Sequence, residues 1–430
     1  MAGLNRTHDP KARSWVETAN EAACEFPIQN LPYGIFSAGS QPCAGVAIGD
    51  QILNLSLLEA EGFVRPSPNE PVFSGDTLNN FMALGQGAWS RTRDRIFELL
   101  SAGSGGLCDN ADLTGRALVA MSQARLHLPI FVRSYTDFYA SLEHATNVGT
   151  MFRGADNALP PNWLHIPIGY NGRASSVVVS GTDIHRPWGQ LKGPDDEVPR
   201  FAPSERFDIE LELGAIVGSP SSFGQPVTVE QAYDMIFGYV LLNDWSARDI
   251  QAWEYQPLGP FQAKATATTI SPWIVTAEAL VPFRVSAPER KLRLLTYLTE
   301  SMPNNFDIDL EIQLIPDNVR ASTISRTNYR TMYYSCAQQL AHHTTSGCPM
   351  CTGDLLGSGT ISGATRDSLG SLLELSCGGK EPIELDNGQT RSFVEDGDTI
   401  VLRGHCQGQG YRVGFGKCSG TVMPAVNYPG

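Results

Sequence analysis

Acidic and apolar residues alternate in the segment FDIELELG, at positions 207–214. On a β-strand successive side chains point to opposite faces, so Asp208, Glu210 and Glu212 would share one face. Same-face neighbours lie roughly 7 Å apart, and adjacent carboxylates repel each other unless water solvates them or a cation lies between them. Such hard oxygen ligands suit Ca²⁺ or Mg²⁺ better than zinc. For this segment alone a solvated outer face is the simpler interpretation, and a cation site is the alternative.

A second group of polar residues follows an apolar stretch, in the segment NDWSARDIQAWEY at positions 243–255. If this segment is helical, its spacing places a carboxylate, a guanidinium, an amide and a phenol on one face. These residues are Asp244, Arg248, Gln251 and Tyr255. We expect Trp245 and Trp253 to lie opposite that face, in the core. A simple Asp–Arg helix pair explains the pattern as well as a binding face does.

A third group lies in YTDFYASLEH, at positions 135–144. It contains a potential metal ligand, Asp137, seven residues before His144 in a tyrosine-rich stretch. A histidine of this kind can act as a general base or as a ligand. The default for any lone histidine is nevertheless a packed or surface position, and the segment alone leaves both interpretations open.

Other motifs point away from particular functions. His342 and His343 form a pair for which we expect a packing or helix-end role, and Cys348 and Cys351 lack the second CxxC pair of a zinc site. There is no P-loop, no strand-associated GxGxxG and no serine-hydrolase elbow. Nucleotide binding and serine catalysis are therefore not supported.

The elements that must position these residues are mostly short strands. Residues 26–65 contain β-like runs broken by Pro and Gly, and residues 77–101 have helical spacing. After residue 131 short apolar runs predict many strands, including one at 207–216, with helices only at 244–255 and 332–343. We predict a mainly β protein with an N-terminal domain at 1–130 and a larger antiparallel sandwich or roll at 131–430.

Composition limits the partners and the compartment. A formal net charge of −14 argues against nucleic acid as a partner, so an anionic substrate would need locally concentrated positive charge. No apolar run approaches the length of about twenty residues that a membrane span needs. Nine cysteines spread over 430 residues suggest no disulfide framework. We therefore expect a cytoplasmic protein without a membrane partner.

Several long segments, in the same order, resemble the fumarylacetoacetase family from FPIQNLPYGIFS almost to the C-terminus. They are YTDFYASLEHATNVGTMFRG, PNWLHIPIGYNGRASSVVVSG, FDIELELG, LLNDWSARDIQAWEYQPLGPF, GSGTISG and GQGYRVGFG. The resemblance implies a small SH3-like barrel followed by a mixed β-roll, and a homodimer. It also implies hydrolysis of 4-fumarylacetoacetate to fumarate and acetoacetate, the last step of tyrosine and phenylalanine degradation.

The resemblance also implies roles for individual residues. It places the ligands of a divalent cation, Ca²⁺ or Mg²⁺, at Asp137, Glu210, Glu212 and Asp244, and leaves Asp208 outside this set. A second cation position would use Asp244, Lys264 and Thr268, with Lys264 contributing its backbone carbonyl because an ammonium group cannot ligate a cation.

The resemblance further implies that His144 is the general base and that Glu374 orients it. The oxyanion-binding groups would be Arg248, Gln251 and Lys264. The substrate contacts would be Tyr139, Arg153, Tyr170, Gln251, Tyr255 and Thr360. Two alternatives remain: another enzyme of the superfamily, such as an acylpyruvate hydrolase, hydratase or decarboxylase, and a non-catalytic β protein stabilised by Ca²⁺. The long N-terminal part disfavours the first, and the His, Glu, Arg and Lys positions disfavour the second.

Overall fold

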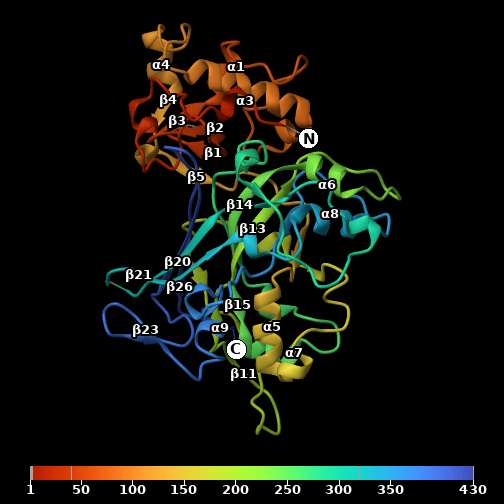
Figure 1. Ribbon diagram of the computed structural model, residues 1–430. Coiled ribbons are helices and arrows are strands. Elements are labelled where there is room, and N and C mark those ends of the chain that lie inside the picture. The colour runs from red at the N-terminus through yellow and green to blue at the C-terminus, as the bar shows by residue number, and fades with distance from the viewer. Residues whose placement is uncertain (1–2, 40, 318, 430) are drawn as a thin grey trace.

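The computed structural model describes residues 3–39, 41–317 and 319–429. Its N-terminal part is built on a five-stranded sheet with the order β4-β3-β2-β1-β5, in which every pair is antiparallel. The strands are β1 Tyr33–Ser37, β2 Cys43–Ile48, β3 Gln51–Asn54, β4 Leu118–Ala120 and β5 Arg125–His127. Figure 1 shows this part as a separate lobe above the rest of the chain.

Four α-helices accompany the N-terminal sheet. They are α1 Leu55–Ala60, α2 Asn79–Met82, α3 Gln86–Leu100 and α4 Ala111–Ala117. The helical spacing at 77–101 thus corresponds to two helices, because Gly85, between α2 and α3, has φ +82° and interrupts the helix. A residue with a side chain rarely adopts that left-handed conformation, which explains why glycine occupies the break.

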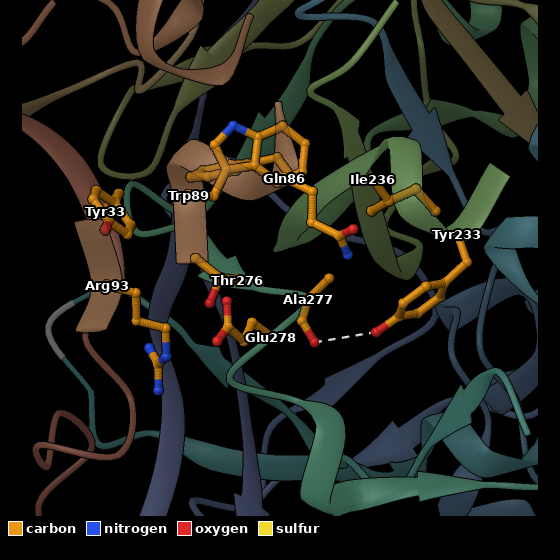
Figure 2. A pocket seen from close by; sticks show the side chains of 10 residues that line it. Tyr33, Gln86, Trp89, Arg93, Tyr233, Ile236, Thr276, Ala277 and Glu278 are labelled. Atoms are coloured by element: carbon orange, nitrogen blue, oxygen red, sulfur yellow. Dashed lines mark hydrogen bonds between the residues drawn. The ribbon is translucent and has the colours of Figure 1, made fainter. Parts of the chain in front are cut away.

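The N-terminal part is joined to the larger part by polar contacts of Glu278. Arg93 of α3 is buried and donates to two backbone carbonyls, while Glu278 accepts from Asn5 Nδ2 at 2.8 Å and from Ser90 Oγ at 2.7 Å. Figure 2 shows Arg93 and Glu278 lining a small cavity, on whose far side Tyr233 donates to the carbonyl of Ala277. The Glu278 contacts connect the two parts of the chain, whereas Arg93 bonds the backbone of Gln29 and Asn30 within the N-terminal part.

The larger part contains a mixed eight-stranded sheet with the order β7-β6-β22-β13-β14-β16-β8, and β17 also pairs with β14. The strands are β6 Tyr135–Phe138, β7 Gly169–Asn171, β8 Val177–Val179, β13 Leu211–Val217, β14 Ile236–Asp244, β16 Thr268–Ile270, β17 Val275–Thr276 and β22 Leu355–Gly357. β13 and β14 are buried along their whole length. At these two central strands both faces of the sheet therefore lie inside the protein.

A second, five-stranded sheet with the order β21-β20-β25-β26-β9 packs against β14 through β25 and β26. Its strands are β9 Ile184–His185, β20 Asp309–Ile315, β21 Ser322–Asn328, β25 Thr399–Gln407 and β26 Arg412–Met423. Every second residue of β20 is buried, so this sheet has one core face and one outer face. The packed and curled sheets confirm the prediction of a mainly β fold with a mixed roll.

Shorter elements complete the larger part. The remaining strands are β10 Trp188–Leu191, β11 Arg200–Pro203, β12 Phe207–Asp208, β15 Ser246–Ala247, β18 Arg284–Val285, β19 Asn305–Phe306, β23 Ile383–Glu384 and β24 Thr390–Arg391. The α-helices are α5 Leu142–Arg153, α6 Val229–Met235, α7 Arg248–Glu254, α8 Cys336–Thr344 and α9 Leu372–Leu375. Figure 1 places α5, α7 and α9 together at the end remote from the N-terminal lobe.

Three local predictions differ from the structure. The strand predicted at 207–216 is divided into β12 and β13, and β12 pairs with β15 instead of continuing in the large sheet. The helix predicted to begin at Asp244 begins at Arg248, because β14 continues through Asp244. Trp253 is 43% exposed and lies outside the core, whereas Trp245 is fully buried as predicted.

Across the described residues, no helix combines the length and the apolar character that a membrane-spanning helix requires.

Candidate functional site

Four buried carboxylates converge in the large sheet. Asp137 lies on β6, Glu212 on β13, Asp244 at the end of β14, and Glu210 immediately before β13. One ligand oxygen from each lies within 4.8 Å of those of the others. The sheet creates this cluster because β22 pairs with both β6 and β13, and β13 pairs with β14. The simpler interpretation of FDIELELG as a solvated outer face is wrong, since all three of its carboxylates are buried.

The carboxylates are only partly neutralised by the protein. Lys264 Nζ donates to Glu210 Oε2 at 2.5 Å and to Asp244 Oδ2 at 2.8 Å. In contrast, Asp137 Oδ1 and Glu212 Oε1 are buried and accept no hydrogen bond from the described residues. Burial, followed by repulsion from neighbouring carboxylates, raises the pKa of both Asp137 and Glu212 well above its usual value. If all four carboxylates were ionised, the cluster would therefore carry more negative charge than Lys264 offsets.

The arrangement fits a hard divalent cation. The two unpartnered oxygens supply anionic ligands that no described donor satisfies, and carboxylate oxygens are the ligands that Ca²⁺ and Mg²⁺ prefer. Gly357 of β22 borders the same space: a Cβ atom there would lie 2.6 Å from Asp137 Oδ1 and 2.9 Å from Glu212 Oε2. The sequence thus leaves the space between these carboxylates open.

The open space gives a testable prediction. Replacing Gly357 with alanine should lower the affinity for Ca²⁺ or Mg²⁺ by about 10–100-fold, as disturbing groups around metal ligands usually does. The added methyl group must displace Asp137 or Glu212. Calorimetric titration of chelator-treated protein with Ca²⁺ or Mg²⁺ would measure the affinity. The matched control is Gly214→Ala, whose methyl group would contact Leu355 and Val240 instead, and equal affinities in the two variants would contradict the prediction.

Further oxygen-containing groups surround the cluster. The hydroxyl of Tyr170 donates to Asp137 Oδ2 at 2.9 Å and to Asp244 Oδ2 at 3.2 Å, and Thr268 Oγ1 donates to Asp244 Oδ1 at 3.2 Å. The structure thus places the side chains of Lys264 and Thr268 beside Asp244. Their use at a second cation position stays a prediction.

A histidine–glutamate pair lies next to the cluster. His144, in the first turn of α5, places Nδ1 2.7 Å from Glu374 Oε2 of α9, and both side chains are buried. Burial alone would raise the pKa of Glu374, but His144 and the hydrogen bonds that the carboxylate accepts lower it below its usual value. An ionised Glu374 accepts from Nδ1–H, which leaves the lone pair of the imidazole on Nε2. The pair therefore has the form of an oriented general base.

Three side chains hold Glu374 in addition to His144. Asn147 Nδ2 donates to Oε1 at 2.9 Å, while Ser362 Oγ and Ser371 Oγ donate to Oε2 at 2.9 and 2.8 Å. Sequence reasoning missed these residues and also missed Gly357. Ser371 alone had a local signal, because a serine three residues before a glutamate is typical of a helix N-cap. Nothing in the spacing of the others connects them to the site.

Positively charged and amide groups face the same region. Arg248, the first residue of α7, donates from Nη1 to Gln251 Oε1 at 3.1 Å, and its Nη2 lies 2.7 Å from Glu210 Oε1. Burial would raise the pKa of Glu210, but Lys264 and Arg248 lower it below its usual value. Arg248, Gln251 and Lys264 thus bring donors and positive charge to one edge of the cluster, where a developing oxyanion would be stabilised.

These groups border one cleft of about 430 Å³, a size suited to a small organic ligand. The predicted site residues that line it are Asp137, Tyr139, His144, Arg153, Tyr170, Glu210, Arg248, Gln251, Tyr255, Lys264 and Thr360. Thr360 Oγ1 is buried and has no hydrogen-bond partner in the described parts of the chain. The other predicted residues, Glu212, Asp244, Thr268 and Glu374, do not line the cleft, but Asp244 bonds Tyr170 and Lys264 of the lining and Glu374 bonds His144. The cleft therefore combines a carboxylate cluster that could hold a cation, a histidine oriented by a glutamate, and several hydrogen-bond donors.

Comparison with known proteins places this arrangement in a family. The model described as "Fumarylacetoacetate (FAA) hydrolase C-terminal" matches residues 133–423, and "Fumarylacetoacetase N-terminal" matches residues 29–129. The fumarylacetoacetase of Rattus norvegicus is 52% identical over 419 residues, covering 96% of this chain and 99% of that protein. Those of Homo sapiens and Arabidopsis thaliana are 50% and 47% identical, with the same coverage of both chains.

A solved structure agrees with these matches at the level of the fold. It is the fumarylacetoacetate hydrolase from psychrophilic Exiguobacterium antarcticum, which is 15% identical. The comparison covers 92% of this chain and 99% of that one, with a TM-score of 0.51.

Proposed function

The chain belongs to the fumarylacetoacetase family and is a hydrolase, and we propose that it cleaves 4-fumarylacetoacetate to fumarate and acetoacetate. The observation that carries this proposal is the position of the His144–Glu374 pair and the four-carboxylate cluster at one cleft. Relatives that share half of their residues over nearly the whole chain are named fumarylacetoacetase, which supports the substrate.

The residues that would hold a divalent cation are Asp137, Glu210, Glu212 and Asp244. When bound, Ca²⁺ or Mg²⁺ would supply positive charge that polarises a substrate carbonyl. A second cation position would lie at Asp244, with the Lys264 carbonyl and Thr268. The first position is supported by the unpartnered oxygens of Asp137 and Glu212, which no described donor satisfies.

The protein's own groups account for the hydrolytic step. His144 Nε2 accepts a proton from water, and Glu374 holds the imidazole by accepting from Nδ1–H. The hydroxide adds to the ketone carbon at the fumaroyl side of the scissile bond, and the oxyanion is stabilised by Arg248, Gln251 and Lys264. The carbon–carbon bond then breaks, so that the oxygen stays in fumarate. The proton held by His144 is returned to the carbon of the departing acetoacetate.

Binding of the substrate requires local positive charge on a protein with a net charge of −14. We assign carboxylate recognition to Arg153, which lines the cleft and donates to the Ala158 carbonyl at 2.6 Å. The remaining proposed contacts are Tyr139, Tyr170, Gln251, Tyr255 and Thr360. The Tyr139 ring meets the His144 ring edge to face at 5.4 Å, which supports a role beside the reacting carbon.

We also propose a division into domains near residue 130, a homodimer and a cytoplasmic location. Exposed apolar side chains in the larger part support a second copy as partner, because such groups commonly mark protein interfaces. They include Phe201, Trp253, Leu258 and Tyr428, and Leu258 is 94% exposed. The nine free cysteines suit a reducing compartment.

The proposed function is tested with purified protein in the presence of Mg²⁺ or Ca²⁺. We expect the ultraviolet absorption of 4-fumarylacetoacetate to disappear, and NMR spectroscopy to identify equal amounts of fumarate and acetoacetate. The same assay on several 2,4-diketo acids defines the specificity. Unchanged absorption with the metal-supplemented protein would refute the proposed substrate.

A further inference from the structure

Asp208 is a fully buried carboxylate that sequence comparison leaves outside the cation ligands. It lies on β12, two residues before Glu210. Its oxygens accept hydrogen bonds from four donors. Oδ1 accepts from the backbone of Ile209 at 2.7 Å and of Leu372 at 2.9 Å. Oδ2 accepts from the backbone of Leu373 at 3.0 Å and from Arg248 Nε at 2.8 Å.

Two of these donors belong to parts of the site that lie far apart in the sequence. Arg248 carries the guanidinium that we assign to the oxyanion, and its Nε bond to Asp208 fixes the direction of its other nitrogens. Leu372 and Leu373 open helix α9, whose next residue is Glu374. A single carboxylate therefore contacts both the oxyanion-binding arginine and the helix that presents the partner of His144.

We propose that Asp208 is a positioning residue for hydrolysis, which sets Arg248 and Glu374 in one arrangement around His144. This rests on the proposed function, because it assigns Asp208 to the same reaction. Asp208 itself does not line the cleft and acts only through its contacts. A shift of α9 would move Glu374, and a turn of Arg248 would remove a donor from the oxyanion, so both parts of the reaction depend on one side chain.

The number of donors explains why a carboxylate is required at this position. Each oxygen of Asp208 meets two donors, so an amide nitrogen on either side would face two N–H groups. Asparagine has nearly the same shape but cannot accept all four bonds. In Asp208→Asn either α9 or Arg248 must move, and misplacement of catalytic groups by about 1 Å can cost about 10²-fold in rate.

The first test compares Asp208→Asn with Asp398→Asn on the full-length protein. Asp398 is a matched control, because it is also buried, bonded to Arg391 at 2.8 and 3.0 Å, and accepts from the Glu395 backbone at 2.9 Å. We expect Asp208→Asn to lower kcat about 10²-fold with KM changed only a few-fold. Asp398→Asn should change stability without changing kcat. Equal kcat values in the two variants would overturn the positioning role.

A double-mutant cycle tests whether Asp208 acts through its contacts. If Asp208 acts through Glu374 and Arg248, adding Asp208→Asn to Glu374→Gln or to Arg248→Gln should lower kcat much less than it does in the wild type. If Asp208→Asn lowers kcat by the same factor in both single variants as in the wild type, the proposal is overturned. A structural defect alone would lower stability but would not produce this pattern in kcat.

A second variant keeps the proposal testable if Asp208→Asn does not fold. Asp208→Glu retains the charge that Arg248 pairs with, but its extra methylene group moves the carboxylate, so we expect kcat to fall about tenfold or more. Wild-type kcat in Asp208→Glu would overturn the positioning role. Wild-type protein without activity on 4-fumarylacetoacetate would instead refute the proposed function, so the two failures are distinguishable.

Discussion

Replacing His144 with glutamine is expected to lower kcat by about 10²–10⁴-fold, the usual contribution of a positioned general base. Among the described histidines, only His144 both lines the cleft and bonds a buried glutamate. Glutamine can keep a hydrogen bond to Glu374 but cannot take a proton from water near neutral pH. KM should change little, because His144 acts on water and not on substrate binding.

The pH dependence distinguishes loss of the base from disturbed packing. Loss of the base should change the shape of the pH–rate profile, because such a profile reports the acids and bases that act in the reaction. The control is His342→Gln, a histidine of α8 that contacts Tyr297, and it should keep both the rate and the profile. Turnover of His144→Gln at the wild-type rate with an unchanged profile would refute the assignment.

The local pattern of the sequence predicted one of the strands that position this site. Alternation in FDIELELG indicated a strand, and a cation site was one of the two interpretations of its carboxylates. Burial could not be predicted from the segment, because it depends on the pairing of β13 with β22 and of β22 with β6. Glu212 is covered because Gly357 and Gly359 approach it: a Gly357 Cβ would lie 2.9 Å from Oε2, and Gly359 N donates to the same oxygen at 2.9 Å.

Helical spacing was misleading at Asp244. A helix from Asp244 would place Arg248 one turn away, but Asp244 ends β14, and its partners are Lys264, Thr268 and Tyr170. The strand continues because Asp244 and Asn243 pair with β16, a contact that lies more than twenty residues ahead in the sequence. Polar residues at the end of a buried strand can thus imitate the first turn of the following helix.

The connection between His144 and Glu374 shows the limit of sequence reasoning most clearly. These residues are separated by 230 positions, and no local pattern joins them. The resemblance to a family proposed the pair, and the structure brings the two side chains into contact. Neither source indicated Asn147 or Ser362, whose hydrogen bonds to Glu374 depend on how α5 and the segment after β22 pack around α9.

The cation cluster gives the second large prediction: replacing Glu212 with glutamine should abolish stabilisation by Ca²⁺ or Mg²⁺ and lower kcat by about 10³-fold. The estimate for kcat corresponds to several kcal/mol of transition-state stabilisation by a Lewis acid, at about 1.4 kcal/mol for each tenfold change. A cation at about a hundredfold excess over its Kd should stabilise the wild type by about 2.7 kcal/mol. Thermal unfolding of both proteins, with the cation and with chelator, measures this stabilisation.

The pH dependence of the metal-free protein follows from the same charges. Burial raises the pKa of Asp137 and Glu212 in the folded state above that in the unfolded chain, which is about 4. These two carboxyl groups therefore stabilise the folded protein fully only below about pH 4. Their contribution is lost as the pH rises through their pKa in the folded state. Glutamine at position 212 stays neutral at every pH, so the variant loses less folding stability than the wild type as the pH rises. Metal-free Glu212→Gln should therefore become more stable relative to metal-free wild type as pH increases from 5 to 8.

Asp354→Asn separates the effect of a buried carboxylate from the effect of the cluster. Asp354 is buried, has its pKa raised by burial and leaves Oδ1 without a hydrogen-bond partner among the described residues, but it is not one of the four clustered carboxylates. Its replacement should also change the pH dependence of stability, yet preserve the increase in Tm on adding Ca²⁺ or Mg²⁺. If Glu212→Gln retains that increase as well, the cation does not bind at this cluster, and the metal-dependent part of the proposed reaction must be abandoned.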